Sequence, residues 1–146
     1  MRITISNEID KEILKIMLSE EEFHNFAQSR FLPTQKVVLN FYNDSEYIGF
    51  VEFEIKSANR NGYVTYLVLP ENRGKGYGKE MLRKAVDFAF SNLNLFRITA
   101  EVYEYNKRSI GLLESLGFEL EGRLRKAKYY NGKYWDILVF GKRRDS

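Results

Sequence analysis

The sequence predicts a single domain of mixed α/β class, and three observations point to it. The chain has 146 residues, a length that suits one domain with its own core. Hydrophobic residues make up 44% of the composition and aromatic residues 15%, which is enough apolar material for that core. Segments with helical spacing and segments with strand alternation succeed one another, without a repeat, a low-complexity segment or an internal linker.

The first quarter of the chain is expected to hold a short strand and two helices. Residues 2–5 predict the strand, and apolar residues at near-helical spacing predict a helix over 7–18. Ser19 with Glu22 has the spacing of a capping box, which predicts a second helix reaching Ala27.

Three strands are expected next, over 36–42, 47–56 and 63–69. The second alternates apolar with charged residues, which predicts one buried and one solvated face. The third barely alternates, which predicts a central strand covered on both faces. The remaining expected elements are a helix over 79–91, a strand over 96–105, a helix over 107–116, and two strands over 118–123 and 134–140 around an Asn-Gly turn.

The chain has no cysteine and one histidine, His24, and this narrows its chemistry. A disulfide scaffold, a thiolate zinc site, an iron–sulfur cluster and a cysteine nucleophile are excluded. His24 falls on the second predicted helix and is expected to be a structural or surface residue. The chemistry must then use carboxylates, hydroxyls, amines and the backbone, and we expect no metal.

The net charge of +3 is unevenly distributed. Residues 1–60 carry 7 basic and 10 acidic side chains, whereas residues 121–146 carry 8 basic and 3 acidic ones. A solvated basic surface is the plain interpretation, and nucleic acid, a phosphorylated ligand or an acidic partner are alternatives. No apolar run approaches the roughly 20 residues of a membrane span, and the N-terminus lacks a signal-peptide pattern, so we expect no membrane partner and a cytoplasmic protein.

Three glycines, at positions 74, 76 and 78, stand between a predicted buried strand and a predicted helix. Such a turn exposes backbone N–H groups at a helix N-terminus, which favours a phosphate, and Arg73, Lys75 and Lys79 add positive charge. A plain glycine-rich connection is the alternative. A dinucleotide fingerprint fails because position 79 is not glycine, and a Walker A loop fails because Arg73 and Glu80 occupy two required positions.

Further motifs follow the glycine-rich loop, and together with it they indicate a family. The full set is Arg73-x-x-Gly76-x-Gly78, Asn106-x-x-Ser109, Leu-Leu-Glu-Ser-Leu-Gly-Phe over 112–118, Glu121-Gly122, and Asn131-Gly132-Lys133-Tyr134 followed by Asp136. Together they resemble the GNAT family of N-acetyltransferases, in the branch with ribosomal-protein N-terminal acetyltransferases and spermidine N-acetyltransferases. The likeness covers roughly residues 63–140.

The resemblance implies a fold and a division of the chain. The fold is a single domain with a central mixed, mostly antiparallel sheet of six to seven strands, splayed at the cofactor site and flanked by about four helices. Within one domain over 1–146, residues 1–60 would take the acceptor side, 61–92 the phosphate loop and its helix, and 93–146 the C-terminal strands and helix.

The resemblance also implies acetyl-CoA as co-substrate. The backbone of Leu67, Val68 and Leu69 would contact its pantetheine arm, with the N–H of Val68 polarising the thioester carbonyl. Asn106 would bind a pantetheine amide. The residues implied to surround the phosphates are Arg73, Gly74, Lys75, Gly76, Tyr77, Gly78, Lys79 and Arg108.

Without cysteine, direct attack of an amine on acetyl-CoA is the expected reaction, and it needs a base and an acid. The resemblance assigns the base to Glu101 and the acid to Ser109. Tyr103 and Tyr105 are fallback donors if Ser109 is not the acid. Many members carry the acid as a tyrosine at the position of Leu113, which excludes that acid here. Glu101 as a surface residue and Ser109 as a helix-start residue are the structural alternatives.

Two other functions remain open at this point, a ribosome- or RNA-binding module without catalysis and a CoA sensor, although nucleic acid is not expected. The acceptor is a protein N-terminus, a polyamine or another small amine. A polyamine site would need the carboxylates of Glu52, Glu54, Glu101 and Glu104 to be gathered. A homodimer is possible. An aromatic cluster of Tyr129, Tyr130, Tyr134 and Trp135 is expected to pack in the core, with an acceptor pocket or a dimer contact as alternatives.

Overall fold

The computed structural model describes residues 1–25 and 34–146, and the backbone divides into two compact units, Met1–Pro33 and Thr34–Ser146. The first unit holds helix α1, Lys11–Met17, whose N-terminus is capped by the Asp10 carboxylate accepting from the Glu12 N–H at 2.9 Å. The strand expected over 2–5 is wrong, because these residues are exposed and have no regular structure. A strand needs a neighbouring ladder to satisfy its backbone, and local sequence does not supply one.

The capping box expected at Ser19 is also wrong. Its hydroxyl donates backwards to the carbonyl of Ile16 at 2.7 Å, so it ends the preceding turn instead of opening a helix. A 3₁₀ turn at Phe23–Asn25 stands in the described part of the predicted helix, and residues 26–27 lie outside the described residues. His24 is exposed, with its ring against the edge of Phe23, as expected of a surface histidine.

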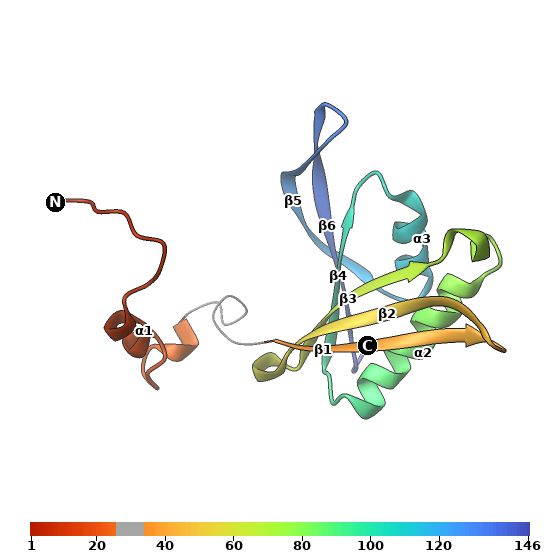
Figure 1. The fold of residues 1–146 in the computed structure, drawn as a ribbon, viewed down its shortest axis with the longest axis horizontal. Helices are drawn as coiled ribbons and strands as arrows, with labels where there is room; N and C mark the ends of the chain where they lie inside the picture. Colours follow the sequence, from red (N-terminus) through yellow and green to blue (C-terminus); the bar gives the residue numbers. More distant parts are fainter. Residues whose placement is uncertain (26–33) are drawn as a thin grey trace. The chain divides into compact units, whose positions relative to one another are not determined.

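In the second unit, the described residues form one sheet of six strands in the order β1-β2-β3-β4-β6-β5 (Figure 1). Every neighbouring pair is antiparallel except β3 and β4, which are parallel. The strands are β1 Gln35–Asn43, β2 Glu46–Lys56, β3 Asn61–Val68, β4 Arg97–Tyr103, β5 Glu119–Tyr130 and β6 Lys133–Arg143. The predicted mixed, mostly antiparallel sheet is confirmed.

Two helices belong to this unit, α2 at Tyr77–Asn92 and α3 at Lys107–Ser115. The apolar stripe of α2 is buried, and α2 lies along the sheet beside β2 and β3 (Figure 1). The alternation predicted in β2 is confirmed, since Val51, Phe53 and Ile55 are all at most 5% exposed. With α1, the described residues hold three α-helices, one fewer than the four expected.

The sheet opens between β3 and β4. Their pairing covers only Asn61–Tyr63 against Arg97–Thr99, and β3 continues to Val68 without β4 beside it. The expectation that this strand is covered on both faces is therefore wrong, because Thr65 and Leu67 are exposed. An apolar run of this kind occurs both in a strand buried on two faces and in a strand that borders an opening, and the sequence does not distinguish the two.

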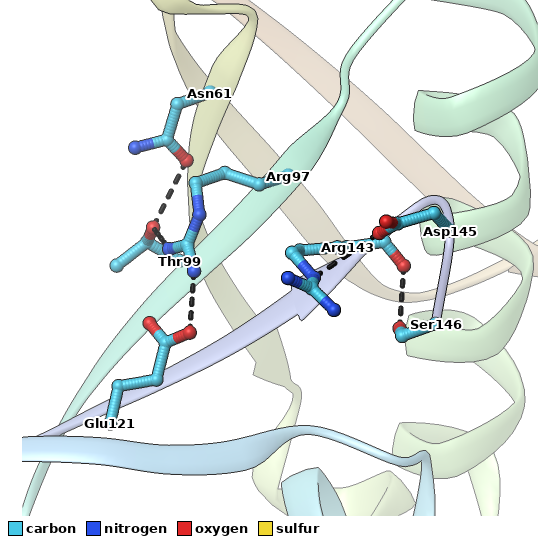
Figure 2. Close-up of polar contacts among 7 residues, drawn as sticks. All are labelled: Asn61, Arg97, Thr99, Glu121, Arg143, Asp145 and Ser146. Carbon is cyan, nitrogen blue, oxygen red and sulfur yellow. Dashed lines mark hydrogen bonds and ion pairs between the residues drawn. The ribbon is translucent and has the colours of Figure 1, made fainter.

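A polar network holds the paired end of β3 and β4 together (Figure 2). The Thr99 hydroxyl donates to Asn61 Oδ1 on β3 at 3.0 Å and accepts from Arg97 Nη1 at 2.8 Å. Arg97 Nη2 also donates to Glu121 Oε2 on β5 at 2.5 Å. Because Thr99 is only 5% exposed, these bonds satisfy a buried hydroxyl and link three strands below the opening.

The hairpin of β5 and β6 extends beyond β4, whose last paired residue is Tyr103 opposite Ile137 (Figure 1). The expected core packing of its aromatic residues is wrong for Tyr129, Tyr130 and Tyr134, which are 63%, 53% and 64% exposed. Beyond the end of β4 there is no core to bury these three rings, so they contact one another and the neighbouring Tyr105. No helix within the described residues is long and apolar enough to cross a membrane.

Candidate functional site

The opening between β3 and β4 forms a cleft with a volume of about 610 Å³. Its walls come from β3, the glycine-rich loop, the end of β4 and the first turns of α3. The lining residues are Val64, Thr65, Tyr66, Leu67, Val68, Arg73, Gly74, Gly76, Gly78, Lys79, Glu101, Val102, Tyr103, Asn106, Arg108, Ser109 and Leu112.

Of the sixteen residues that the sequence assigned to cofactor binding or catalysis, twelve line this cleft. Leu69, Lys75, Tyr77 and Tyr105 do not. Leu69 donates its backbone N–H to the carbonyl of Ile48, and the Tyr77 hydroxyl accepts from Asn43 at 3.0 Å.

The glycine-rich loop leaves backbone N–H groups open at the start of α2. Gly74 and Gly76 adopt φ of +79° and +83°, which glycine tolerates far better than other residues, and Gly76 is the N-cap of α2 with no side-chain hydrogen bond. Arg73 Nε donates to the Val68 carbonyl at 3.0 Å, and the Arg73 and Lys79 side chains share the cleft. Free N–H groups, a helix N-terminus and two cations fit a phosphate-bearing ligand.

The edge of β3 that faces the opening has backbone groups available. The N–H of Leu69 donates across to Ile48 on β2 at 2.9 Å, so the N–H of the preceding residue, Val68, faces the opposite edge. The Val68 carbonyl points the same way, since it accepts from Arg73 rather than from β2. An extended ligand in the cleft can therefore pair with β3 as a missing strand would.

The start of α3 brings three more predicted residues into the cleft, Asn106, Arg108 and Ser109. Asn106 is the N-cap, and its Oδ1 accepts from the backbone N–H of Ser109 at 3.2 Å. Leu113 is 1% exposed and belongs to the core.

The sequence reasoning missed Tyr66. This residue of β3 lines the cleft, and its hydroxyl forms a short hydrogen bond with that of Ser109. Burial raises the pKa of the Tyr66 phenol above its ordinary value, against smaller lowering effects of the Ser109 hydrogen bond and the Arg108 charge. No local pattern marks Tyr66, because its partner lies 43 residues away.

Glu101 and Tyr103 stand on the solvated face of β4, while Ala100 and Val102 face the core. The Tyr103 ring stacks on Tyr105 with centroids 5.5 Å apart. Glu101 is thus an exposed carboxylate at the wall of the cleft, within a setting of hydroxyl and aromatic groups.

The other carboxylates considered for a polyamine site are not gathered here. Glu52 pairs with Lys36 at 3.9 Å, Glu54 with Lys56 at 3.3 Å, and Glu104 with Arg123 at 3.6 Å. Among the described residues, Glu101 is the single carboxylate that lines the cleft.

The family model of the GNAT acetyltransferase domain matches residues 2–139. An uncharacterized N-acetyltransferase, YokL, from Bacillus subtilis is 30% identical, over 98% of this chain and 85% of its own length. Spermidine N(1)-acetyltransferases from Vibrio cholerae and Escherichia coli are 31% and 34% identical over 82% and 83% of this chain. The chain spans 66% and 61% of the length of those two enzymes.

Solved structures agree with the family model. The Vibrio cholerae spermidine N-acetyltransferase in complex with CoA and spermine matches 87% of this chain and 76% of its own, with 26% identity and a TM-score of 0.72. The ribosomal protein acetyltransferase RimL in complex with coenzyme A covers 75% of this chain and 63% of its own, with 22% identity and a TM-score of 0.70, and shows the fold alone. None of these relatives supports a non-catalytic RNA-binding or sensing role. The chain belongs to the GNAT acetyltransferase family and is an acetyl-CoA-dependent N-acetyltransferase.

Proposed function

We propose that a primary amine attacks the thioester of acetyl-CoA directly in the cleft between β3 and β4, without an acyl-enzyme. The observation that carries this proposal is the early end of the β3–β4 pairing at Tyr63 and Thr99. Beyond it, a free strand edge, the glycine-rich loop and one carboxylate border a single cleft. Holding both reactants in one cleft removes much of the entropic barrier to a bimolecular reaction.

On the donor side, the loop from Arg73 to Lys79 and Arg108 bind the phosphates, and the β3 edge and Asn106 bind the pantetheine arm. The support is the open backbone N–H groups at the start of α2 and the cleft position of these side chains. The Val68 N–H, which faces the opening, donates to the carbonyl oxygen as negative charge develops on it.

On the acceptor side, Glu101 takes a proton from the incoming ammonium group. One carboxylate in the cleft is sufficient to deprotonate one amine. Spermidine is the first acceptor to test, because enzymes that act on it are at least 31% identical to this chain. A protein N-terminus is the second, because it also presents a single amine to a single base.

The assembly and the division of the chain are part of the same proposal. We place the acceptor side within residues 1–60, the phosphate loop and its helix in 61–92, and the C-terminal strands and helix in 93–146, in one domain located in the cytoplasm. The spermidine N-acetyltransferase from Vibrio cholerae forms a dodecamer. For this chain we propose a homodimer as the smallest unit. Light scattering on the purified chain tests that unit.

The experiment is an acceptor panel read by two independent signals. Purified protein is given acetyl-CoA with spermidine, peptides with free N-termini or aminoglycosides, and both thiol release and acetylated amine are measured. Equal amounts of the two products with at least one amine are expected. Thiol release that does not depend on any amine would contradict the proposed reaction.

A further inference from the structure

The hydrogen bond between Tyr66 and Ser109 joins the two walls of the cleft. Tyr66 comes from β3 and Ser109 from the first turn of α3, and both line the cleft. Each is held independently, because the ring of Tyr66 packs against the core and the backbone of Ser109 is bonded to Asn106. Their contact is therefore a fixed part of the site.

The direction of this hydrogen bond follows from the acidity of the two groups. A phenol, with an ordinary pKa of about 10, is a much stronger acid than an aliphatic alcohol and so the better donor. Burial raises the pKa of Tyr66, so its phenol keeps its proton at neutral pH. The phenol then donates to Ser109 Oγ, and the hydrogen of the Ser109 hydroxyl is left to point elsewhere.

The reaction supplies an acceptor for that hydrogen. When the tetrahedral intermediate breaks, the C–S bond leaves its electron pair on sulfur, and the thiolate must take a proton. Hydrogen bonds in a chain polarise one another, so a Ser109 hydroxyl that accepts from a phenol is itself a better donor.

We propose that Tyr66 is a positioning residue that orients the Ser109 hydroxyl toward the leaving thiolate of CoA and passes on the proton that Ser109 gives up. This inference rests on the proposed direct transfer. Sulfur gains the Ser109 proton, Ser109 regains one from Tyr66, and the phenolate regains one from solvent. The incoming ammonium group loses two protons in becoming an amide and the sulfur takes up one, so one proton is released overall. Arg108, whose positive charge acts on Tyr66, stabilises the transient phenolate.

The position of Leu113 fits this arrangement. Leu113 on α3 is a buried leucine and supplies no hydroxyl, whereas Tyr66 on β3 brings a phenol to the cleft. In this chain the phenol reaches the site through Ser109 instead of from the body of α3.

The test is a double-mutant cycle with Tyr66→Phe and Ser109→Ala. Tyr66→Phe keeps the ring and removes only the hydroxyl, and we expect kcat to fall by about 10²-fold, the lower end of acid–base contributions. The Kd of acetyl-CoA, measured by calorimetry, should stay within about twofold of the wild-type value. In the Ser109→Ala background, Tyr66→Phe should cause no further loss, because the two hydroxyls act as one unit.

Tyr47→Phe is the matched control, since it removes a phenol that bonds Asn40 at 2.9 Å outside the cleft lining. It should leave kcat and the Kd of acetyl-CoA unchanged. Thermal unfolding of all variants checks that each is folded at the assay temperature.

A second acetyl donor separates an effect of Tyr66 on protonation of the leaving group from an effect on packing of the site. The selenium analogue of acetyl-CoA releases a weaker base, which needs less help from an acid, so the loss in Tyr66→Phe should shrink several-fold. An equal loss with both donors, an unchanged kcat in Tyr66→Phe, or independent losses in the cycle would each overturn the inference. If the wild-type chain acetylates no amine, the proposed function fails; if it does and one of these three results appears, only the role of Tyr66 fails.

Discussion

Asn106 Oδ1 accepts a 3.2 Å hydrogen bond from the backbone N–H of Ser109, so the residue that caps α3 also fixes the backbone of a hydroxyl that lines the cleft. The Asn106 side chain therefore both caps α3 and positions part of the cleft wall. Substitutions at this position are expected to affect both stability and ligand binding, and the two effects can be separated.

We expect Asn106→Ala to lower the free energy of unfolding by about 1 kcal/mol, the usual effect of losing an N-cap. It should also weaken acetyl-CoA binding, because the proposed contact to pantetheine is lost. Asn106→Asp retains a capping oxygen but has no amide donor, so it should restore stability and leave binding weak. Urea denaturation and calorimetry measure the two effects, and full recovery of binding in Asn106→Asp would limit the residue to a capping role.

Glu101→Gln should lower turnover by about 10²-fold or more, because a base within the cleft is removed. The free energy of unfolding should not change, since Glu101 is exposed. Glu114→Gln, an exposed position of α3 outside the cleft lining, is the control and should keep full activity. Equal turnover for Glu101→Gln and wild type in the thiol-release assay would remove Glu101 from the mechanism.

Gly76→Ala should destabilise the chain by about 1–2 kcal/mol, because alanine is strained at a φ of +83°. The added methyl group meets no atom within 4 Å, so the cause would be backbone strain alone. The matched substitution Gly111→Ala, inside α3 and equally open, should stabilise by about 0.5–1 kcal/mol. Acetyl-CoA binding should weaken only for Gly76→Ala, and calorimetry showing the same Kd for both would place the phosphates elsewhere.

Asp136 should give the folded state an acid-sensitive contribution. Hydrogen bonds from the Lys126 N–H and then from the Arg123 guanidinium hold the pKa of its carboxyl below the ordinary value. A carboxyl whose pKa is lowered on folding stabilises the fold at pH values above its unfolded-state pKa of about 3.9. This stabilisation is lost as the pH falls through the folded-state pKa.

Asp136→Asn should therefore be less stable than wild type at pH 7, with the difference shrinking as pH falls below about 4. Arg123→Met, which removes one partner of this carboxylate, should reduce the acid sensitivity in part. Urea denaturation across a pH series checks both. Parallel curves for wild type and Asp136→Asn would show that the carboxylate makes no pH-dependent contribution.

Thr99→Val should destabilise by about 1–3 kcal/mol, because it keeps the shape but leaves two partly buried polar partners without their hydroxyl. Asn61 Oδ1 would lose a donor and Arg97 an acceptor at the paired end of β3 and β4. Thr65→Val, on the same sheet but exposed, should change stability by less than about 0.5 kcal/mol. Equal effects of the two substitutions on chemical denaturation would contradict a structural role for this network.

The strands and helices of residues 34–146 were predictable because their signals are local. In β2, alternation alone identified the buried face, and in α2 the stripe from Met81 to Ala89 did the same. The helix expected from Ser19 failed because its hydroxyl had a competing acceptor in the preceding turn, the Ile16 carbonyl.

The sequence by itself determined the family, the order of the elements and the position of the glycine-rich loop, since each is encoded in residues close together along the chain. The tertiary structure decided where the pairing of β3 with β4 ends, that the Val68 N–H faces the opening, and which carboxylate lines the cleft. It also decided that Tyr66 bonds to Ser109, and that the hairpin aromatics stand in solvent. These are relationships between residues far apart in the chain, and they depend on how strands diverge and helices dock, which no local pattern specifies.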